Sequence, residues 1–153
     1  MKKFIKSFFY ACKGVVLCFK CERNFRFHIV FTGFVFWFSG FFGLDRGEYA
    51  ILALTCGLVI FAEAFNTAVE NAVDFTGEKY SDLAKNAKDA AAGGVLLAAV
   101  TAVAVGLFLF GKKSGFVAMY DYYADNPLMF ALLLAAIAAG VVIVFAIPLK
   151  PGK

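Results

Sequence analysis

Apolar side chains recur every three or four positions along the first twenty residues of the chain. This spacing places them on one face of a helix, while lysines occupy the opposite face and its flanks. Aromatic residues on one face and lysines on the other are typical of a helix lying in the membrane interface. We therefore predict an amphipathic surface helix over residues 1–20, with packing of the same face on protein as the alternative. The apolar positions are Ile5, Phe8, Phe9, Cys12, Val15, Val16 and Phe19.

Longer apolar runs follow, and their length predicts transmembrane helices. The first has an uncharged core of only about 24 Å as a helix, against a hydrocarbon core of about 30 Å. The second is longer than a bilayer needs, so we expect its second half to emerge into water. The third is rich in alanine and glycine, which favours close helix packing in lipid. The four predicted spans are residues 27–44, 49–74, 89–110 and 128–147.

The segments between these spans are short and polar. Residues 44–48 form a tight connection, and residues 111–127 are expected to be a linker. In the segment 76–86, a glycine is the predicted helix stop and a serine or aspartate the next helix start.

The distribution of basic residues predicts the orientation. With four spans and the N-terminus inside, the inner segments hold twelve Lys and Arg residues and the outer segments hold three. Cytoplasmic segments of membrane proteins carry such an excess. We therefore expect a multi-pass membrane protein with a cytoplasmic N-terminus.

Composition agrees with a membrane protein. The chain has 153 residues, of which 62% are hydrophobic and only 17% charged. Both values depart from those of an ordinary soluble domain. A net charge of +4 is too small to indicate a nucleic acid as a partner. The four cysteines include one CxxC pair, Cys18 and Cys21, without a second pair to complete a zinc site, so we expect free thiols.

Acidic and amide residues interrupt the second predicted span at helical spacing. Glu63, Asn66, Glu70 and Asp74 fall within about an 80° arc of one helix face. Ionisable groups inside a span cost about 2.5 kcal/mol or more, so they usually face a partner or a water-filled site. The stripe therefore predicts a functional site, with pairing to lysines for assembly alone as the alternative.

Two further polar clusters enter the membrane from the same predicted side. They are "CERNFRFH" at residues 21–28 and "LAKNAKD" at residues 83–89. Carboxylates suit Mg²⁺, lysines suit phosphate oxygens, and a deeper carboxylate can accept the proton of a lipid hydroxyl. These groups together are what phosphoryl transfer requires. The chain has neither a P-loop nor a kinase glycine loop, so the site would be unrelated to those enzymes.

The segments "CERNFRFH", "EAFNTAVENAVD" and "AKNAKDAAAGGVLLAA" together resemble the small integral-membrane lipid kinases of bacteria, the diacylglycerol kinase and undecaprenol kinase family. The resemblance covers about residues 3–110. It implies an all-α fold with a surface helix and a three-span core, assembled as a homotrimer whose active sites are shared between subunits. It also implies transfer of the γ-phosphate of Mg-ATP to a lipid hydroxyl.

The resemblance also assigns roles to individual residues. Glu63 is implied as the catalytic base, and Glu22 and Glu70 as ligands of Mg²⁺ and of the ATP phosphates. Asp74 continues the stripe and is expected to be structural. The remaining implied ATP contacts are Tyr10, Lys79, Tyr80, Ser81, Lys88 and Asp89, and the residues implied around the lipid head are Asn66, Asn24, Arg26 and Ala92.

The lipid acceptor is the least determined expectation. The pattern "ERN-x-R-x-H" resembles the branch that favours undecaprenol, and diacylglycerol is the alternative. An ion-coupled transporter and a non-catalytic membrane scaffold are the competing classes. We divide the chain into a kinase core at residues 1–110, the linker at 111–127 and an extra transmembrane helix at 128–147, which we expect to be a packing helix. For His28, a head-group or interfacial contact and a catalytic part are equally open.

Overall fold

Helices account for all regular structure in the computed structural model, which describes residues 2–75, 77 and 81–146. The prediction of an all-helical chain is therefore confirmed for this part of the protein. A short π-helix, Val142–Ala146, extends the last α-helix. The α-helices are α1 (Lys2–Cys21), α2 (Arg23–Ser39), α3 (Arg46–Phe75), α4 (Asp82–Phe110), α5 (Lys113–Asp125) and α6 (Pro127–Val141).

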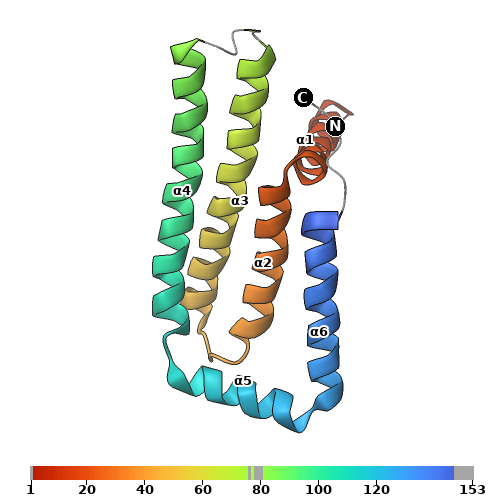
Figure 1. Ribbon diagram of the computed structural model, residues 1–153, viewed down its shortest axis with the longest axis vertical. Helices are drawn as coiled ribbons and strands as arrows, with labels where there is room; N and C mark the ends of the chain where they lie inside the picture. The colour runs from red at the N-terminus through yellow and green to blue at the C-terminus, as the bar shows by residue number, and fades with distance from the viewer. Residues whose placement is uncertain (1, 76, 78–80, 147–153) are drawn as a thin grey trace.

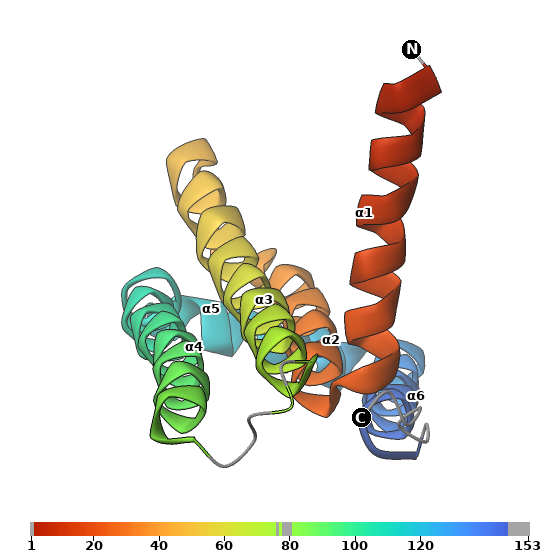
Figure 2. The same cartoon turned by 90° about the horizontal axis from the view of Figure 1, so that it is seen from above.

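Four helices run side by side to form the body of the molecule. Helices α3 and α4 form an antiparallel hairpin, α2 packs on α3, and α6 lies beside α2 (Figure 1). Helix α5 crosses one end of this bundle, and α1 extends sideways from the other end (Figure 2). The α1 helix lies at the same end as the α3–α4 connection, as the predicted topology requires.

Three of the described helices are long and apolar enough to cross a membrane. They are α3, α4 and α6 with its π-helical extension, Pro127–Ala146. Helix α2 has 17 residues, about 25 Å at the helical rise, which agrees with the short core expected for the first span. The chain is thus a helical membrane protein, while the number of spans and their orientation stay predictions.

Local capping explains where α3 and α4 begin. The Asp45 carboxylate accepts a hydrogen bond from the backbone N–H of Glu48 at 2.8 Å. In return, the Glu48 carboxylate accepts one from the backbone N–H of Asp45, also at 2.8 Å, so the two residues form a capping box. Beyond α3, Gly77 has a φ of +73°, a conformation that glycine adopts without strain. The Ser81 hydroxyl then accepts from the backbone N–H of Ala84 at 3.1 Å and caps α4. The expected glycine stop and serine start are both confirmed.

The segment expected to be a linker contains helix α5. Its apolar positions Phe116, Met119 and Tyr123 are spaced by three and four, and they face the bundle end. The ring of Phe42, which is buried, contacts Phe116 edge-on at 5.0 Å between centroids. It also lies so close to Gly115 that no larger residue fits there unless the ring moves. Packing on this ring stabilises a segment whose polar residues alone indicate a loop.

Helix α6 is fixed to α2 near the α1 end of the bundle. Arg26 is buried, and its guanidinium donates to the carbonyl oxygen of Ile143 at 3.0 Å. This carbonyl lies in the π-helix that extends α6. Gly140 brings the two helices close together, because a Cβ at that position would lie 2.9 Å from Cγ1 of Val30. The expected packing helix thus packs on α2 of its own chain.

We predict that Gly140→Leu loosens α6 from α2. The added side chain meets Val30 and Phe34, and such overpacking costs about 1–3 kcal/mol. Thermal unfolding in detergent should show a lower midpoint for this variant than for Ala139→Leu. Ala139 is the matched control because it is exposed and adjacent. Equal midpoints for the two variants would contradict the observed packing.

Candidate active site

The polar stripe lies on α3 and changes character along the helix. Glu63, nearest the middle of the bundle, is 4% exposed. One turn further, Asn66 Nδ2 donates to Glu70 Oε1 at 2.9 Å. At the end of α3, Lys88 Nζ of α4 lies 2.6 Å from Asp74 Oδ1. The stripe therefore combines a deep carboxylate, an amide–carboxylate pair and an ion pair that ties α3 to α4.

Glu63 faces α2, and its nearest ionisable neighbour is a histidine. Nε2 of His28 lies 3.3 Å from Oε1 of Glu63. The Thr67 hydroxyl donates to the Glu63 backbone carbonyl at 3.0 Å, so it does not occupy the carboxylate. Taking a carboxylate out of water is costly unless a polar partner compensates. The His28 contact supplies such a partner.

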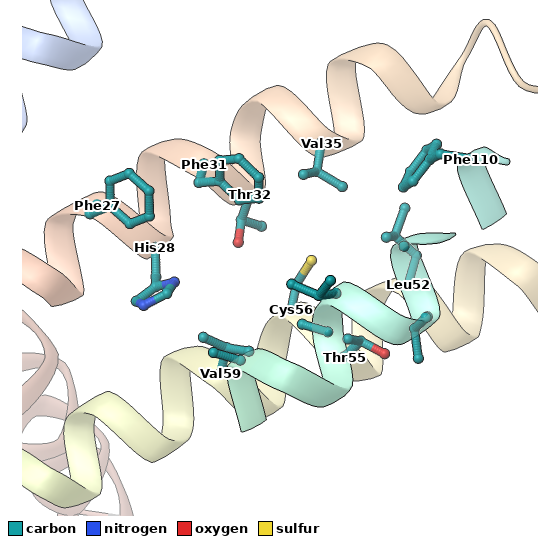
Figure 3. Close-up of a pocket in the computed structure, with 15 residues that line it drawn as sticks. Phe27, His28, Phe31, Thr32, Val35, Leu52, Thr55, Cys56, Val59 and Phe110 are labelled. Carbon is teal, nitrogen blue, oxygen red and sulfur yellow. The ribbon is translucent and has the colours of Figure 1, made fainter. Parts of the chain in front are cut away.

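An apolar cavity of about 360 Å³ begins at His28 and runs between α2, α3 and α4 (Figure 3). His28 lies at one end, where its ring points from α2 towards α3, and Phe110 lies at the other. The walls are almost entirely apolar, with Thr32, Thr55 and Cys56 among the few polar groups. Binding sites for small molecules have volumes in this range. The cavity can therefore accept an apolar chain whose polar end lies beside His28 and Glu63.

The junction of α1 and α2 carries the first sequence cluster. Glu22 has an extended backbone, with φ −116° and ψ 118°, and it separates the two helices. Buried Cys18 at the end of α1 makes a side-chain hydrogen bond with Thr67, so α1 contacts α3 beside Glu63. Asn24 is exposed, and Tyr10 is 65% exposed on α1. Within this chain the junction therefore brings Glu22 towards the stripe and leaves Asn24 and Tyr10 on the surface.

Arg26 has a structural contact that the sequence did not indicate. The resemblance implied a place around the lipid head, whereas its Nη1 donates to Ile143 of the π-helical extension of α6, across 117 residues of sequence. The side chain is 1% exposed. The role at the lipid head stays a prediction.

On α4, the candidate residues occupy the first three turns. Ser81 is the helix cap, and Lys88 pairs with Asp74 while keeping further donors on its ammonium group. Asp89 and Ala92 are exposed. Lys79 and Tyr80, also predicted to contact ATP, lie outside the described residues.

The described residues contain no group of three His, Cys, Asp or Glu side chains close enough to hold a metal ion by themselves. Magnesium is usually held by one or two carboxylates together with substrate phosphates, so two acids suffice. Beside Glu70, the Oδ1 atom of Asn66 is buried and has no hydrogen-bond partner in the described chain. A metal-bound water could donate to it. The donor set on α3 therefore fits a hydrated magnesium ion.

The sequence analysis did not predict two contacts of the site. The pairing of His28 with Glu63 joins positions 35 residues apart, and it depends on how α2 docks on α3. The only signal in the sequence was a single polar residue at the edge of an apolar run. Likewise, the contact from Arg26 to Ile143 ends on a backbone atom, which no side-chain pattern can reveal.

These features define a helical membrane protein with a buried carboxylate beside an apolar cavity and a polar stripe leading away from it. The model of the family described as prokaryotic diacylglycerol kinase matches residues 9–110, about two thirds of the chain. The chain therefore belongs to this family of lipid kinases, and hence of phosphotransferases. The match ends with α4, so α5 and α6 lie outside it.

Individual relatives carry two names. A diacylglycerol kinase of Synechocystis is 51% identical over 102 residues, which cover 65% of this chain and 58% of that protein. The undecaprenol kinase of Bacillus subtilis is 38% identical over 113 residues, covering 74% of this chain and 92% of that protein. A diacylglycerol kinase of Helicobacter pylori is 33% identical over 96 residues, covering 63% of this chain and 75% of that protein. No solved structure matches the chain.

We predict that Cys18 reacts with maleimide at least about ten-fold more slowly than Cys12, which is exposed. Burial raises the pKa of the Cys18 thiol, and the hydrogen bond with Thr67 opposes this effect. A raised pKa leaves less of the reactive thiolate at neutral pH, so Cys18 labelling should accelerate only as the solution becomes alkaline.

Single-cysteine variants labelled in detergent measure both rates. Labelling after denaturation in dodecyl sulfate is the control and should proceed equally at the two positions. Equal rates in the folded protein would contradict the docking of α1 on α3.

Proposed function

We propose that this protein transfers the γ-phosphate of Mg-ATP to the primary hydroxyl of undecaprenol and yields undecaprenyl phosphate. Membership of a lipid kinase family supports the reaction class. The apolar cavity supports an acceptor with a long hydrocarbon chain. Both competing classes, an ion-coupled transporter and a non-catalytic scaffold, lose support from that membership.

One observation supports the chemistry most directly: Glu63 is a buried carboxylate next to the His28 end of an apolar cavity. A lipid alcohol with its chain in this cavity would place its hydroxyl near Glu63. A carboxylate within hydrogen-bond reach of that hydroxyl can act as a general base. In the step, the lipid oxygen forms a bond to the γ-phosphorus and its proton passes to Glu63. The bond between the γ-phosphorus and the bridging oxygen breaks, and ADP leaves.

Residues nearer the α1 end of the bundle would hold the nucleotide. Glu70 and Glu22 would bind magnesium, and Lys88 would contact phosphate with the ammonium donors that Asp74 leaves available. Magnesium, when bound, neutralises phosphate charge. Asn66 would orient Glu70 through the hydrogen bond between them. Ser81, Asp89, Tyr10, and residues 79 and 80 would complete the nucleotide site, with Asn24, Arg26 and Ala92 near the lipid head.

A homotrimer with shared sites would account for the exposed candidates. Tyr10, Asn24, Asp89 and Ala92 are exposed in the single chain, although the resemblance assigns them to the site. A neighbouring subunit could cover them. Large apolar side chains on α3 and α4, such as Phe65 and Leu97, are also exposed and could face lipid or a second copy. We further propose a bacterial cell membrane location with the site on the cytoplasmic side.

Diacylglycerol is the second candidate acceptor, because the relative from Synechocystis is named a diacylglycerol kinase. The name of the Bacillus subtilis relative, an undecaprenol kinase, supports the first candidate.

We predict that Glu63→Gln lowers transfer of phosphate to lipid by at least about 100-fold, the usual loss when a general base is removed. The amide keeps the size of the side chain but cannot accept the proton. Transfer of labelled phosphate from ATP to lipid in mixed micelles measures the effect. Glu48→Gln is the matched control, because Glu48 lies on the same helix but at its first turn, away from the site. Glutamine can also complete the capping box, so this substitution should keep the helix start intact. Full turnover in the Glu63 variant would remove it as the base.

A further inference from the structure

His28 is the only histidine of the chain, and it faces the proposed base. Its side chain is 21% exposed and that of Glu63 is 6% exposed, so both are largely shielded from water. Nε2 lies 3.3 Å from Oε1 of Glu63. The Phe27 ring stands nearly perpendicular to the imidazole at 5.4 Å between centroids. The histidine is thus packed against Phe27, with one ring nitrogen next to the carboxylate.

Other polar groups around Glu63 are directed elsewhere. On α3, Asn66 donates to Glu70, and the Thr67 hydroxyl donates to a backbone carbonyl. On α2, the Arg26 guanidinium donates to the carbonyl oxygen of Ile143 in the π-helical extension of α6. On α4, residues 90–110, which include the wall of the cavity, contain no ionisable side chain. Cys18 of α1 hydrogen-bonds with Thr67. The imidazole of His28 is thus the ionisable group that the structure places against the Glu63 carboxylate.

We propose that His28 is a positioning residue for phosphate transfer: it donates its Nε2 proton to Oε1 of Glu63 and leaves Oε2 to accept the proton of the lipid hydroxyl. This inference rests on the proposed role of Glu63 as the base. A base is most effective when a third group fixes its orientation. A neutral imidazole can donate one hydrogen bond without neutralising the carboxylate. The same ring forms the end of the cavity, so it also defines where the lipid head stops.

Two substitutions of His28 separate hydrogen bonding from packing. His28→Leu removes the imidazole N–H donor and puts an apolar side chain of similar bulk in its place. His28→Gln keeps an N–H that can reach the same carboxylate oxygen. Phe36→Leu, at an exposed position of the same helix outside the cavity wall, is the control for changes in α2.

We expect His28→Leu to lower kcat for lipid phosphorylation by about ten-fold or more, because a misoriented base transfers protons poorly. The KM for Mg-ATP should stay unchanged, since the nucleotide groups are elsewhere. His28→Gln should recover most of kcat, and Phe36→Leu should retain it. A purely structural role would instead lower the amount of folded protein, or change every kinetic constant, in both His28 variants.

Nitrogen NMR tests the hydrogen bond without using activity. Because the chain has a single histidine, protein labelled with ¹⁵N-histidine gives signals from His28 alone. We expect a protonated Nε2 and an unprotonated Nδ1 at neutral pH. Glu63→Gln should shift the Nε2 signal, and Phe36→Leu should not. An unprotonated Nε2, or an Nε2 signal that does not shift in Glu63→Gln, would overturn the proposal.

The outcomes separate this inference from the proposed function. If Glu63→Gln is inactive and His28→Leu keeps the kcat of the unaltered protein, only the role of His28 fails. If Glu63→Gln is fully active, the base fails and the role of His28 fails with it. If both are impaired and the double variant is no worse than Glu63→Gln alone, the two residues act as one unit, as proposed.

Discussion

The burial of one carboxylate constrains the arrangement of the helices around it. Glu63 is almost completely enclosed, and an ionised carboxylate in an apolar interior costs several kcal/mol unless polar groups compensate. The compensation comes from α2, through the contact between His28 and Glu63. Because this contact requires α2 and α3 at a fixed register, the same interaction also determines the shape of the cavity between α2, α3 and α4.

Segments outside the family match support this register from the other side of α2. Arg26 lies two residues before His28, and its guanidinium donates to Ile143 beyond α6. Gly140 allows α6 to approach Val30, one turn further along α2. At the opposite end, α5 covers Phe42 in the α2–α3 connection. The additional helices thus hold both ends of the helix that carries the histidine, which gives α6 a structural reason to be there.

Most of the fold could be predicted from the sequence because helical periodicity and apolar run length are local properties. The end of α3 and the start of α4 followed from Gly77 and Ser81. Helix α5 was missed because its glycine, lysine and aspartate residues outweighed the spacing of Phe116, Met119 and Tyr123. In the site, the shared face of Glu63, Asn66 and Glu70 was predictable from spacing alone. The partners His28 and Ile143 were not, because they depend on how separate helices dock.

The most direct test is transfer of labelled γ-phosphate from ATP and Mg²⁺ by the purified protein, with equal amounts of undecaprenol and diacylglycerol in mixed micelles. With undecaprenol as the proposed acceptor, we expect the label mainly on undecaprenol. Label mainly on diacylglycerol would contradict the proposed acceptor and keep the reaction class. Label on neither lipid, with protein shown to be folded, would contradict the proposal that this protein is a lipid kinase.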